Sequence, residues 1–261
     1  MDLLASKHYC LMTYGCQMNE SDSERYAGQL EELGYTPTED PELADVILMN
    51  TCCVRETAED KVLGKIGEFK HLKARNKDLI LAVTGCMAQE WQDRLFKRAP
   101  HLDLVIGTHN IHKLIDLIRE KEGQKGNHML ATEMEDNVFH AVPTKRFQKF
   151  FAWVPIMNGC NKFCTYCIVP YVRGREVSRP LEEIIEEIHN LAKEGYKEIT
   201  LLGQNVNSYG LDFKDGTDFS ALLYAIEDID GIERVRYMTS HPKDMTFAMI
   251  DAIAQCKKVA S

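Results

Sequence analysis

The sequence predicts an α/β protein in which a parallel α/β domain is followed by part of a β/α barrel. Apolar runs of strand length alternate with amphipathic segments of helix length along most of the 261 residues. The composition, with 44% hydrophobic and 27% charged residues, is that of a globular protein. Strand–helix alternation of this kind favours a parallel sheet with helices on its faces.

Three apolar runs in the N-terminal half predict buried strands, and each ends in a threonine with a cysteine one to three residues later. The runs are HYCLMTYGC, ADVILMNTC and LILAVTGC, which end at Cys16, Cys52 and Cys86. A fourth strand is expected over 102–107. A helix is expected over 21–33, where Ser21 and Glu24 form a capping-box pattern. Further helices are expected over 55–74, 88–98 and 110–121.

These three cysteines are expected to lie near one another although they are far apart in the sequence. Each comes just after the carboxyl end of a predicted parallel strand, and ligands of parallel α/β sheets bind at that edge. The alternative is that Cys16, Cys52 and Cys86 are small buried residues, a common position for free cysteine.

The polar stretch 126–149 predicts a linker between a first domain over 1–125 and a second over 150–261. Within this linker, 137–142 is expected to form a short strand. The second domain begins with a strand over 151–157 and a helix that starts near Pro180 and ends at Gly195. Further strands (197–203, 233–240) and helices (219–229, 243–256) complete three β/α units, half of a six-unit barrel, and a C-terminal truncation at Ser261 is expected.

The loop after the strand over 151–157 carries three cysteines with C-x3-C-x2-C spacing: Cys160, Cys164 and Cys167. Three thiolates on one loop suit a 4Fe–4S cluster whose fourth iron is free to bind S-adenosylmethionine (SAM). One electron from such a cluster cleaves a carbon–sulfur bond of SAM and gives a 5′-deoxyadenosyl radical. The spacing resembles the radical-SAM signature, in which an aromatic residue, here Tyr166, precedes the third cysteine. The alternative is a zinc loop completed by His189 or His241.

The sequence also predicts the cellular compartment of the protein. The N-terminus lacks the features of a signal peptide, and no run of about 18 apolar residues predicts a membrane span. A cytoplasmic location is therefore expected, where the nine cysteines stay reduced. The net charge of −9 argues weakly against nucleic acid as a partner, although a local basic patch can override it.

Several motifs together resemble the MiaB-like methylthiotransferases, which are radical-SAM enzymes with two clusters. These motifs are TYGCQMNESDSE, NTCCVRETAEDKV, VTGCMAQE, GTHNIHKL, GCNKFCTYCIVPYVRGREVSRP and ITLLGQNVNSYG. The resemblance runs over nearly the whole chain. It implies an N-terminal methylthiotransferase domain and a radical-SAM domain with a TIM-like barrel.

The resemblance also implies the activity and the cofactors. Cys16, Cys52 and Cys86 would hold an auxiliary 4Fe–4S cluster, and the loop cysteines the radical-SAM cluster. The reaction would be 2-methylthiolation of N6-isopentenyladenosine at position 37 in the anticodon loop of tRNA. A donor such as flavodoxin or ferredoxin would reduce the clusters. The family usually has one cysteine where this chain has Cys52 and Cys53, and Cys52 is taken as the ligand because it directly follows Asn50 and Thr51.

Relatives in the family complete the barrel and add a small RNA-binding β domain. Both are missing from the 261 residues, so the chain alone is expected to be inactive. Two alternatives remain within the same chemistry: methylthiolation of ribosomal protein S12, or of threonylcarbamoyladenosine in tRNA. An alternative of another class is a non-catalytic iron–sulfur protein for electron transfer or cluster delivery.

Other site residues are predicted from their positions, and no catalytic side chain is expected beyond the cluster ligands. Arg173 and Arg175 follow the cysteine loop and could attract tRNA phosphates or the SAM carboxylate, or could be solvated loop residues. Gln204 and Asn205 follow a strand and could bind SAM or the base, or form a plain turn. Ser240 also ends a strand and could reach the SAM pocket.

Overall fold

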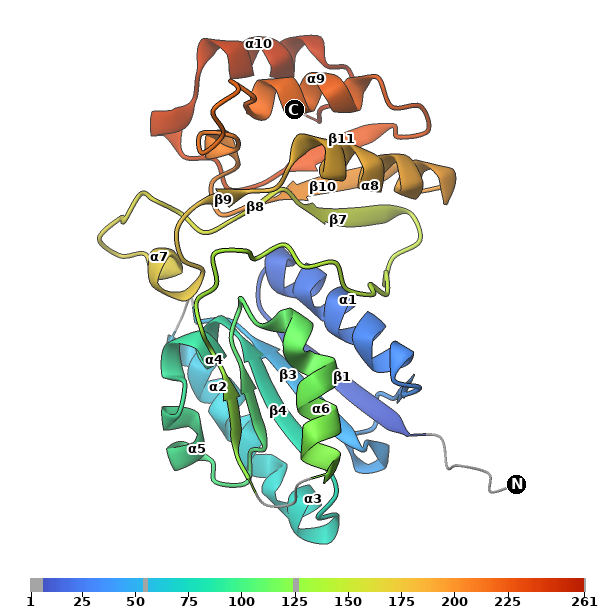
Figure 1. The fold of residues 1–261 in the computed structure, drawn as a ribbon, viewed down its shortest axis with the longest axis vertical. Coiled ribbons are helices and arrows are strands. Elements are labelled where there is room, and N and C mark those ends of the chain that lie inside the picture. The colour runs from blue at the N-terminus through green and yellow to red at the C-terminus, as the bar shows by residue number, and fades with distance from the viewer. Residues whose placement is uncertain (1–6, 54–55, 124–126, 261) are drawn as a thin grey trace. The chain divides into compact units, whose positions relative to one another are not determined.

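The computed structural model describes residues 7–53, 56–123 and 127–260 (Figure 1). The chain separates into two compact units, one ending at Lys145 and the other beginning at Arg146. Residue 126, where the sequence places the start of the linker, lies outside the described ranges. Within those ranges, no helix has the length and apolar character that crossing a membrane requires.

The N-terminal unit is built on a six-stranded sheet in which every strand pair is parallel, which confirms the expected α/β fold. The strand order is β2-β1-β3-β4-β5-β6. The short edge strands β2 and β6 were not expected, and β6 lies in the predicted linker. The strand predicted over 137–142 is wrong, because these residues form no regular element. The strands are β1 (His8–Tyr14), β2 (Thr36–Pro37), β3 (Val46–Thr51), β4 (Ile80–Gly85), β5 (Leu104–Ile106) and β6 (Met129–Ala131).

Helices cover both faces of this sheet, α1 and α6 on one face and α2 to α5 on the other (Figure 1). Alternate residues of β3 point to opposite faces, so Leu48 packs in the core with Leu30 of α1 while Ile47 packs with Ile66 of α2. Burial on both faces explains why the central strands are almost entirely apolar. The helices are α1 (Gln17–Glu32), η1 (Pro41–Leu43), α2 (Glu56–Glu68), α3 (Lys70–Arg75), α4 (Cys86–Trp91), α5 (Arg94–Arg98), η2 (Ile111–Lys113) and α6 (Leu114–Gly123).

Several helix boundaries differ from those expected. Helix α1 begins four residues before Ser21, so Ser21 and Glu24 are buried inside the helix and do not form a capping box. The helix predicted over 88–98 is divided where Gln92 takes a positive φ of 48°. The helix predicted over 55–74 is divided at Phe69, and its first residue lies outside the described ranges.

The C-terminal unit has three parallel strands in the order β11-β10-β7, each followed by a helix, which confirms the expected β/α architecture. A small antiparallel pair, β8 with β9, brackets the cysteine loop. The strands are β7 (Phe151–Pro155), β8 (Met157–Asn158), β9 (Val177–Ser178), β10 (Glu198–Leu202) and β11 (Arg234–Tyr237). The helices are α7 (Val169–Val172), α8 (Leu181–Lys193), η3 (Val206–Ser208), α9 (Phe219–Glu227), η4 (Pro242–Asp244) and α10 (Phe247–Gln255).

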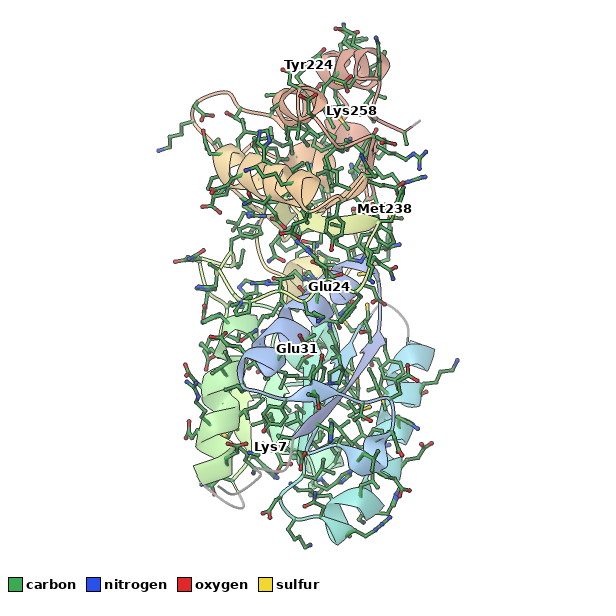
Figure 2. The ribbon with its side chains drawn as sticks, turned by 90° about the vertical axis from the view of Figure 1, so that its right-hand side faces the viewer. Lys7, Glu24, Glu31, Tyr224, Met238 and Lys258 are labelled. Carbon is green, nitrogen blue, oxygen red and sulfur yellow. The ribbon has the colours of Figure 1, made fainter. Side chains whose placement is uncertain are left out.

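One apolar core holds this second unit together. Helix α8 buries Ile184, Ile188 and Leu191, which recur at helical spacing, against Ile199 and Leu201 of β10. Figure 2 draws the side chains of both units as sticks. Near the end of the chain, Lys258 (labelled in Figure 2) donates through Nζ to the carbonyl oxygen of Ile229 at 2.6 Å.

Asp103 lies at the centre of a buried ion network in the N-terminal unit. Its carboxylate lies 2.6 Å from Lys73 Nζ and 2.9 Å from Lys121 Nζ, and it accepts from the backbone N–H of Leu81. Asp103→Asn should lower the free energy of unfolding by about 3 kcal/mol, because it leaves buried ammonium groups without their counter-charge.

Urea denaturation followed by Trp91 fluorescence measures this effect. A Trp153→Phe background removes the second of the two tryptophans, so that the signal reports the N-terminal unit. The exposed Asp116→Asn is the matched control and should change stability by less than about 0.5 kcal/mol. Equal midpoints for the two variants would show that the network contributes nothing.

Candidate metal centres

The register of the N-terminal sheet brings the three predicted cysteine positions to one edge. Tyr14 of β1 pairs with Thr51 of β3, and Thr51 pairs with Gly85 of β4, so the three strands end at the same level. Adjacent strands lie about 4.8 Å apart. The cysteines that follow, Cys16, Cys52 and Cys86, therefore begin from neighbouring points at the carboxyl edge.

A buried polar network lies directly beneath these cysteines. Asn19 Nδ2 donates to Asn50 Oδ1 at 2.9 Å, and Asn50 Nδ2 donates to the oxygen of Ser23 at 3.0 Å. The Ser23 hydroxyl lies 2.7 Å from that of Thr13. Asn19 Oδ1 in turn accepts from the backbone N–H of Cys16 at 3.3 Å. This network ties the start of α1 to the ends of β1 and β3 and thereby positions Cys16.

The two adjacent cysteines after β3 are both close to the site. Cys52 is buried, and Cys53 is partly buried with its thiol hydrogen-bonded to that of Cys86. That hydrogen bond, together with burial, raises the pKa of Cys53. The contact makes Cys53 a competitor for the ligand role that the sequence assigns to Cys52.

The cysteine loop of the C-terminal unit is closed at its base. The β8–β9 pair joins its two ends, and the backbone N–H of Cys160 donates to the carbonyl oxygen of Gly174 at 3.1 Å. Asn158 Nδ2 donates to the carbonyl oxygen of Arg173 at 2.8 Å. Cys160 is buried, whereas Cys164 and Cys167 are partly exposed. Such a loop presents its thiols from a rigid frame.

Residues predicted from the ends of β10 and β11 lie beside this loop. Gln204 Oε1 accepts from the backbone N–H of Gly159 at 2.6 Å. Asn205 is buried and donates through Nδ2 to Asp244 Oδ2 at 2.7 Å, while Asp244 Oδ1 lies 2.6 Å from Lys162 Nζ. Although burial opposes it, these two donors hold the pKa of Asp244 below its ordinary value. The roles of Gln204 and Asn205 toward SAM stay predictions.

The remaining predicted residues differ in exposure. Tyr166 is 92% exposed, and Ser240 is exposed at the end of β11. Arg175 is exposed, with its guanidinium over the Phe163 ring. Arg173 is only 4% exposed and its guanidinium is directed at Asn158, so its position favours support of the loop over contact with a phosphate.

The donor chemistry of both cysteine sets fits iron–sulfur clusters. Burial raises the pKa of Cys160, and the nearby Glu176 carboxylate and the thiols of Cys167 and Cys164 add to the effect. Bound iron would favour the thiolate forms. His241 Nε2 lies 4.0 Å from Cys164 Sγ. The zinc alternative, completed by His241, stays a prediction.

Each of the two units matches a known protein family. Residues 8–107 match the family described as "Uncharacterized protein family UPF0004", and residues 154–260 match the radical SAM superfamily. A protein of Desulforamulus reducens named tRNA-2-methylthio-N(6)-dimethylallyladenosine synthase is 55% identical over 259 residues, which are 97% of this chain and 56% of that protein. A protein of Clostridium botulinum (strain Okra) with the same name is 52% identical over 260 residues, 99% of this chain and 58% of that protein.

The chain resembles the MiaB-like methylthiotransferases over nearly its whole length. It spans a little over half the length of these relatives. Proteins of the radical SAM superfamily use a 4Fe–4S cluster and SAM.

Two solved structures resemble this one in fold alone. The radical SAM methyltransferase TsrM from Kitasatospora setae, with tryptophan and a SAM analogue bound, has a TM-score of 0.64 and 12% identity over 97% of this chain and 58% of its own. The cobalamin-dependent enzyme OxsB has a TM-score of 0.55 and 14% identity over 96% of this chain and 42% of its own.

Sequence reasoning missed the supporting polar residues. Asn19, Ser23 and Asn50 were not singled out, nor was Asp244, which joins Lys162 to Asn205. They could have been found as polar residues at positions that helical or strand periodicity places in the core. Asn50, for example, interrupts the apolar run of β3 one residue before Thr51.

Cys52→Ala and Cys53→Ala decide between the two neighbouring candidates. If Cys52 is the ligand, Cys52→Ala should remove about half of the reconstituted iron. This loss is about four iron atoms per chain, because one 4Fe–4S cluster contains four. Cys53→Ala should leave the iron content unchanged. Iron analysis after anaerobic reconstitution measures both variants, and the reverse result would assign the ligand to Cys53.

Gly85→Ala should disturb the same site through the backbone. Gly85 has a φ of +89°, and a Cβ there would lie 2.4 Å from the carbonyl oxygen of Thr51 and 2.6 Å from Asn50 Oδ1. We expect the loss of about half of the iron, about four atoms. Gly64→Ala is the matched control, since its added Cβ would meet no atom within 4 Å. Full iron content in the Gly85 variant would contradict the claim that this close approach positions Cys86.

Proposed function

We propose that this protein is a radical-SAM methylthiotransferase that converts N6-isopentenyl(dimethylallyl)adenosine at position 37 of tRNA to its 2-methylthio derivative. The observation that carries the proposal is the occurrence of two cysteine triads in two successive α/β units. One triad is assembled by the register of three parallel strands, and the other lies on a loop bracketed by β8 and β9. Relatives at 52–55% identity that bear the synthase name support the choice of substrate.

Each triad would hold one 4Fe–4S cluster through three thiolates and leave one iron open. Bound there, the clusters would supply the electron that cleaves SAM and the sulfur that is transferred to the base. Cys160, Cys164 and Cys167 would be the ligands of the SAM-binding cluster, and Cys16, Cys52 and Cys86 those of the auxiliary cluster.

The chain's other residues would position these groups. Asn19 and Asn50 would hold Cys16 against the strand ends, because both amides are buried and bonded to each other. Gln204 would fix the backbone before Cys160 through its bond to Gly159. The exposed ring of Tyr166 and the hydroxyl of Ser240 would be available to SAM, and the exposed guanidinium of Arg175 to a phosphate of the anticodon loop.

The reaction needs a reductant as well as tRNA. A low-potential one-electron donor such as flavodoxin or ferredoxin would reduce the clusters. We place the reaction in the cytoplasm, where cysteine thiols remain reduced and available to iron.

A chimera tests the proposed function. Residues 1–261 are joined to the part of the Desulforamulus relative that follows its matched stretch, and the chimera is expressed in a bacterial strain that lacks its own synthase. Mass spectrometry of tRNA nucleosides should detect the 2-methylthio product. The chimera with Cys160, Cys164 and Cys167 replaced by alanine should give none. A chimera that binds iron but yields only unmodified isopentenyladenosine would contradict the proposal.

Iron content tests the two-cluster arrangement independently of substrate. The reconstituted chain should hold about eight iron atoms, four in each cube. Alanine at Cys160, Cys164 and Cys167 should remove about half of them, and alanine at Cys16, Cys52 and Cys86 the other half. Complete loss of iron on replacement of either triad would rule out two independent sites.

A further inference from the structure

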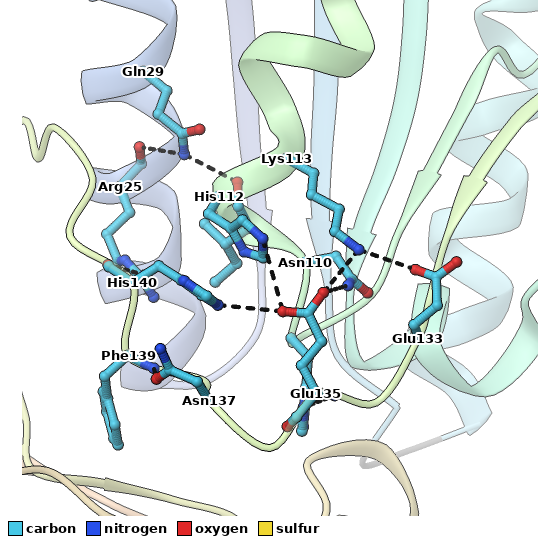
Figure 3. A network of polar contacts seen from close by, with 12 residues as sticks. Arg25, Gln29, Asn110, His112, Lys113, Glu133, Glu135, Asn137, Phe139 and His140 are labelled. Atoms are coloured by element: carbon cyan, nitrogen blue, oxygen red, sulfur yellow. Dashed lines mark hydrogen bonds and ion pairs between the residues drawn. The ribbon is translucent and has the colours of Figure 1, made fainter.

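Two histidines and a glutamate converge in the N-terminal unit, outside both cysteine triads. His112 lies in η2, soon after β5, whereas Glu135 and His140 belong to the connection that follows β6. Figure 3 shows both imidazoles beside one carboxylate. The three donor atoms lie within 4.8 Å of one another, a spacing met by no other such group in the described ranges. Separate segments of the chain therefore bring together three side chains of the types that can bind a metal.

Two of the three donor separations are close to those of a tetrahedral metal site. His140 Nε2 lies 3.2 Å from Glu135 Oε2, and His112 Nε2 lies 3.7 Å from the same oxygen. With metal–nitrogen and metal–oxygen bonds of about 2.1 Å, tetrahedral geometry places neighbouring donor atoms about 3.4 Å apart. Both histidine-to-glutamate separations are within a few tenths of an ångström of this value, and the two histidine donors lie within 4.8 Å of each other.

The hydrogen bonding of His112 is incomplete without an ion. Its Nε2 is directed at the carboxylate but lies beyond hydrogen-bond distance. Its Nδ1 is buried and has no hydrogen-bond partner. A polar ring left without partners costs stability. An ion between Nε2 and Oε2 would provide the interaction that Nε2 lacks.

The other donors are already fixed in place. Glu135 Oε1 accepts from Lys113 Nζ at 2.7 Å and from Asn110 Nδ2 at 2.9 Å, which leaves Oε2 for the imidazoles (Figure 3). The Lys113 charge is shared with Glu133 at 3.3 Å. Arg25 Nη2 donates to the backbone oxygen of His140 at 3.1 Å and anchors that residue to α1. Such outer contacts orient the groups that bind a metal.

We propose that His112, Glu135 and His140 bind one divalent transition-metal ion, with Zn²⁺ as the occupant. Two imidazoles and one carboxylate are a donor set that zinc takes, and three protein ligands leave a fourth position for water. The three side chains are about a quarter exposed, at 24%, 24% and 28%, so water can reach that position. The ion would join the connection after β6 to the end of β5 and stabilise that edge of the sheet.

Zinc binding by matched variants tests the site. The chain is first reconstituted anaerobically with iron and sulfide, then dialysed against Zn²⁺ in a weakly chelating buffer, and its zinc is measured by mass spectrometry. His112→Asn, His140→Asn and Glu135→Gln are compared with wild type, and His189→Asn, an exposed histidine of α8, is the control. All keep the nine cysteines, so zinc held by thiols is the same in each.

Wild type and control should bind about one more zinc per chain than the three variants. Zn²⁺ should also raise the melting temperature of wild type and control by more than that of the variants, since only a folded site binds the ion. Iron content should be equal in all, which separates this result from the two-cluster proposal.

Equal zinc content in wild type and variants with matching circular dichroism would overturn the proposal. Glu135→Gln keeps the side-chain shape and serves as the decisive comparison if a histidine variant fails to fold. Co²⁺ in place of Zn²⁺ gives an independent readout on the wild type. Thiolate-to-cobalt charge-transfer absorption from the additional ion would assign it to cysteine and would equally overturn the site.

Discussion

The parallel register of β1, β3 and β4 is the constraint on which the N-terminal site depends. Because Tyr14, Thr51 and Gly85 pair at one level, the residues that follow them begin at one edge. The register is held by burial of both faces of the sheet. A slip of one residue would turn Asn50 toward the opposite face and place Met49 in the polar network. The apolar pattern of β3 thus fixes the location of Cys52, which lies just beyond the end of the strand.

The two cysteine triads are assembled by different means. In the C-terminal unit the cysteines lie within eight residues of one another, from Cys160 to Cys167, and the fold only has to close the loop. The β8–β9 pair and the bond from Cys160 to Gly174 provide that closure. In the N-terminal unit the fold itself creates the proximity, so a change in packing affects the triad as directly as the loss of a thiol.

Polar groups at the carboxyl edge of the N-terminal sheet are buried but bonded. Asn19, Asn50 and Ser23 satisfy one another where the apolar core ends. A connected network of this kind restricts its members to one arrangement, whereas a partly satisfied one destabilises the fold. His112, in η2 after β5, is such a partly satisfied group, because its Nε2 lies 3.7 Å from Glu135 Oε2, beyond hydrogen-bond distance. The contrast is why an ion is proposed beside His112 and not beside Asn50.

The sequence by itself determined the alternation of strands and helices, the parallel fold and both sets of candidate cysteines. These follow from local periodicity and from the spacing of Cys160, Cys164 and Cys167, which depend on neighbours along the chain. It also predicted a gathering of Cys16, Cys52 and Cys86, because strand ends in parallel sheets share an edge. The early start of α1 and the division of the helix near Gln92 were not predicted, since boundaries depend on tertiary contacts.

Only the tertiary structure decided which polar residues support the sites. Asn19 meets Asn50, Asp244 joins Lys162 to Asn205, and Cys53 reaches Cys86. It also placed β6 on the sheet and brought Glu135 and His140 to His112. These contacts join residues that no helical or strand periodicity relates along the chain. They arise because side chains from different elements fill one volume and must satisfy one another's hydrogen bonds there.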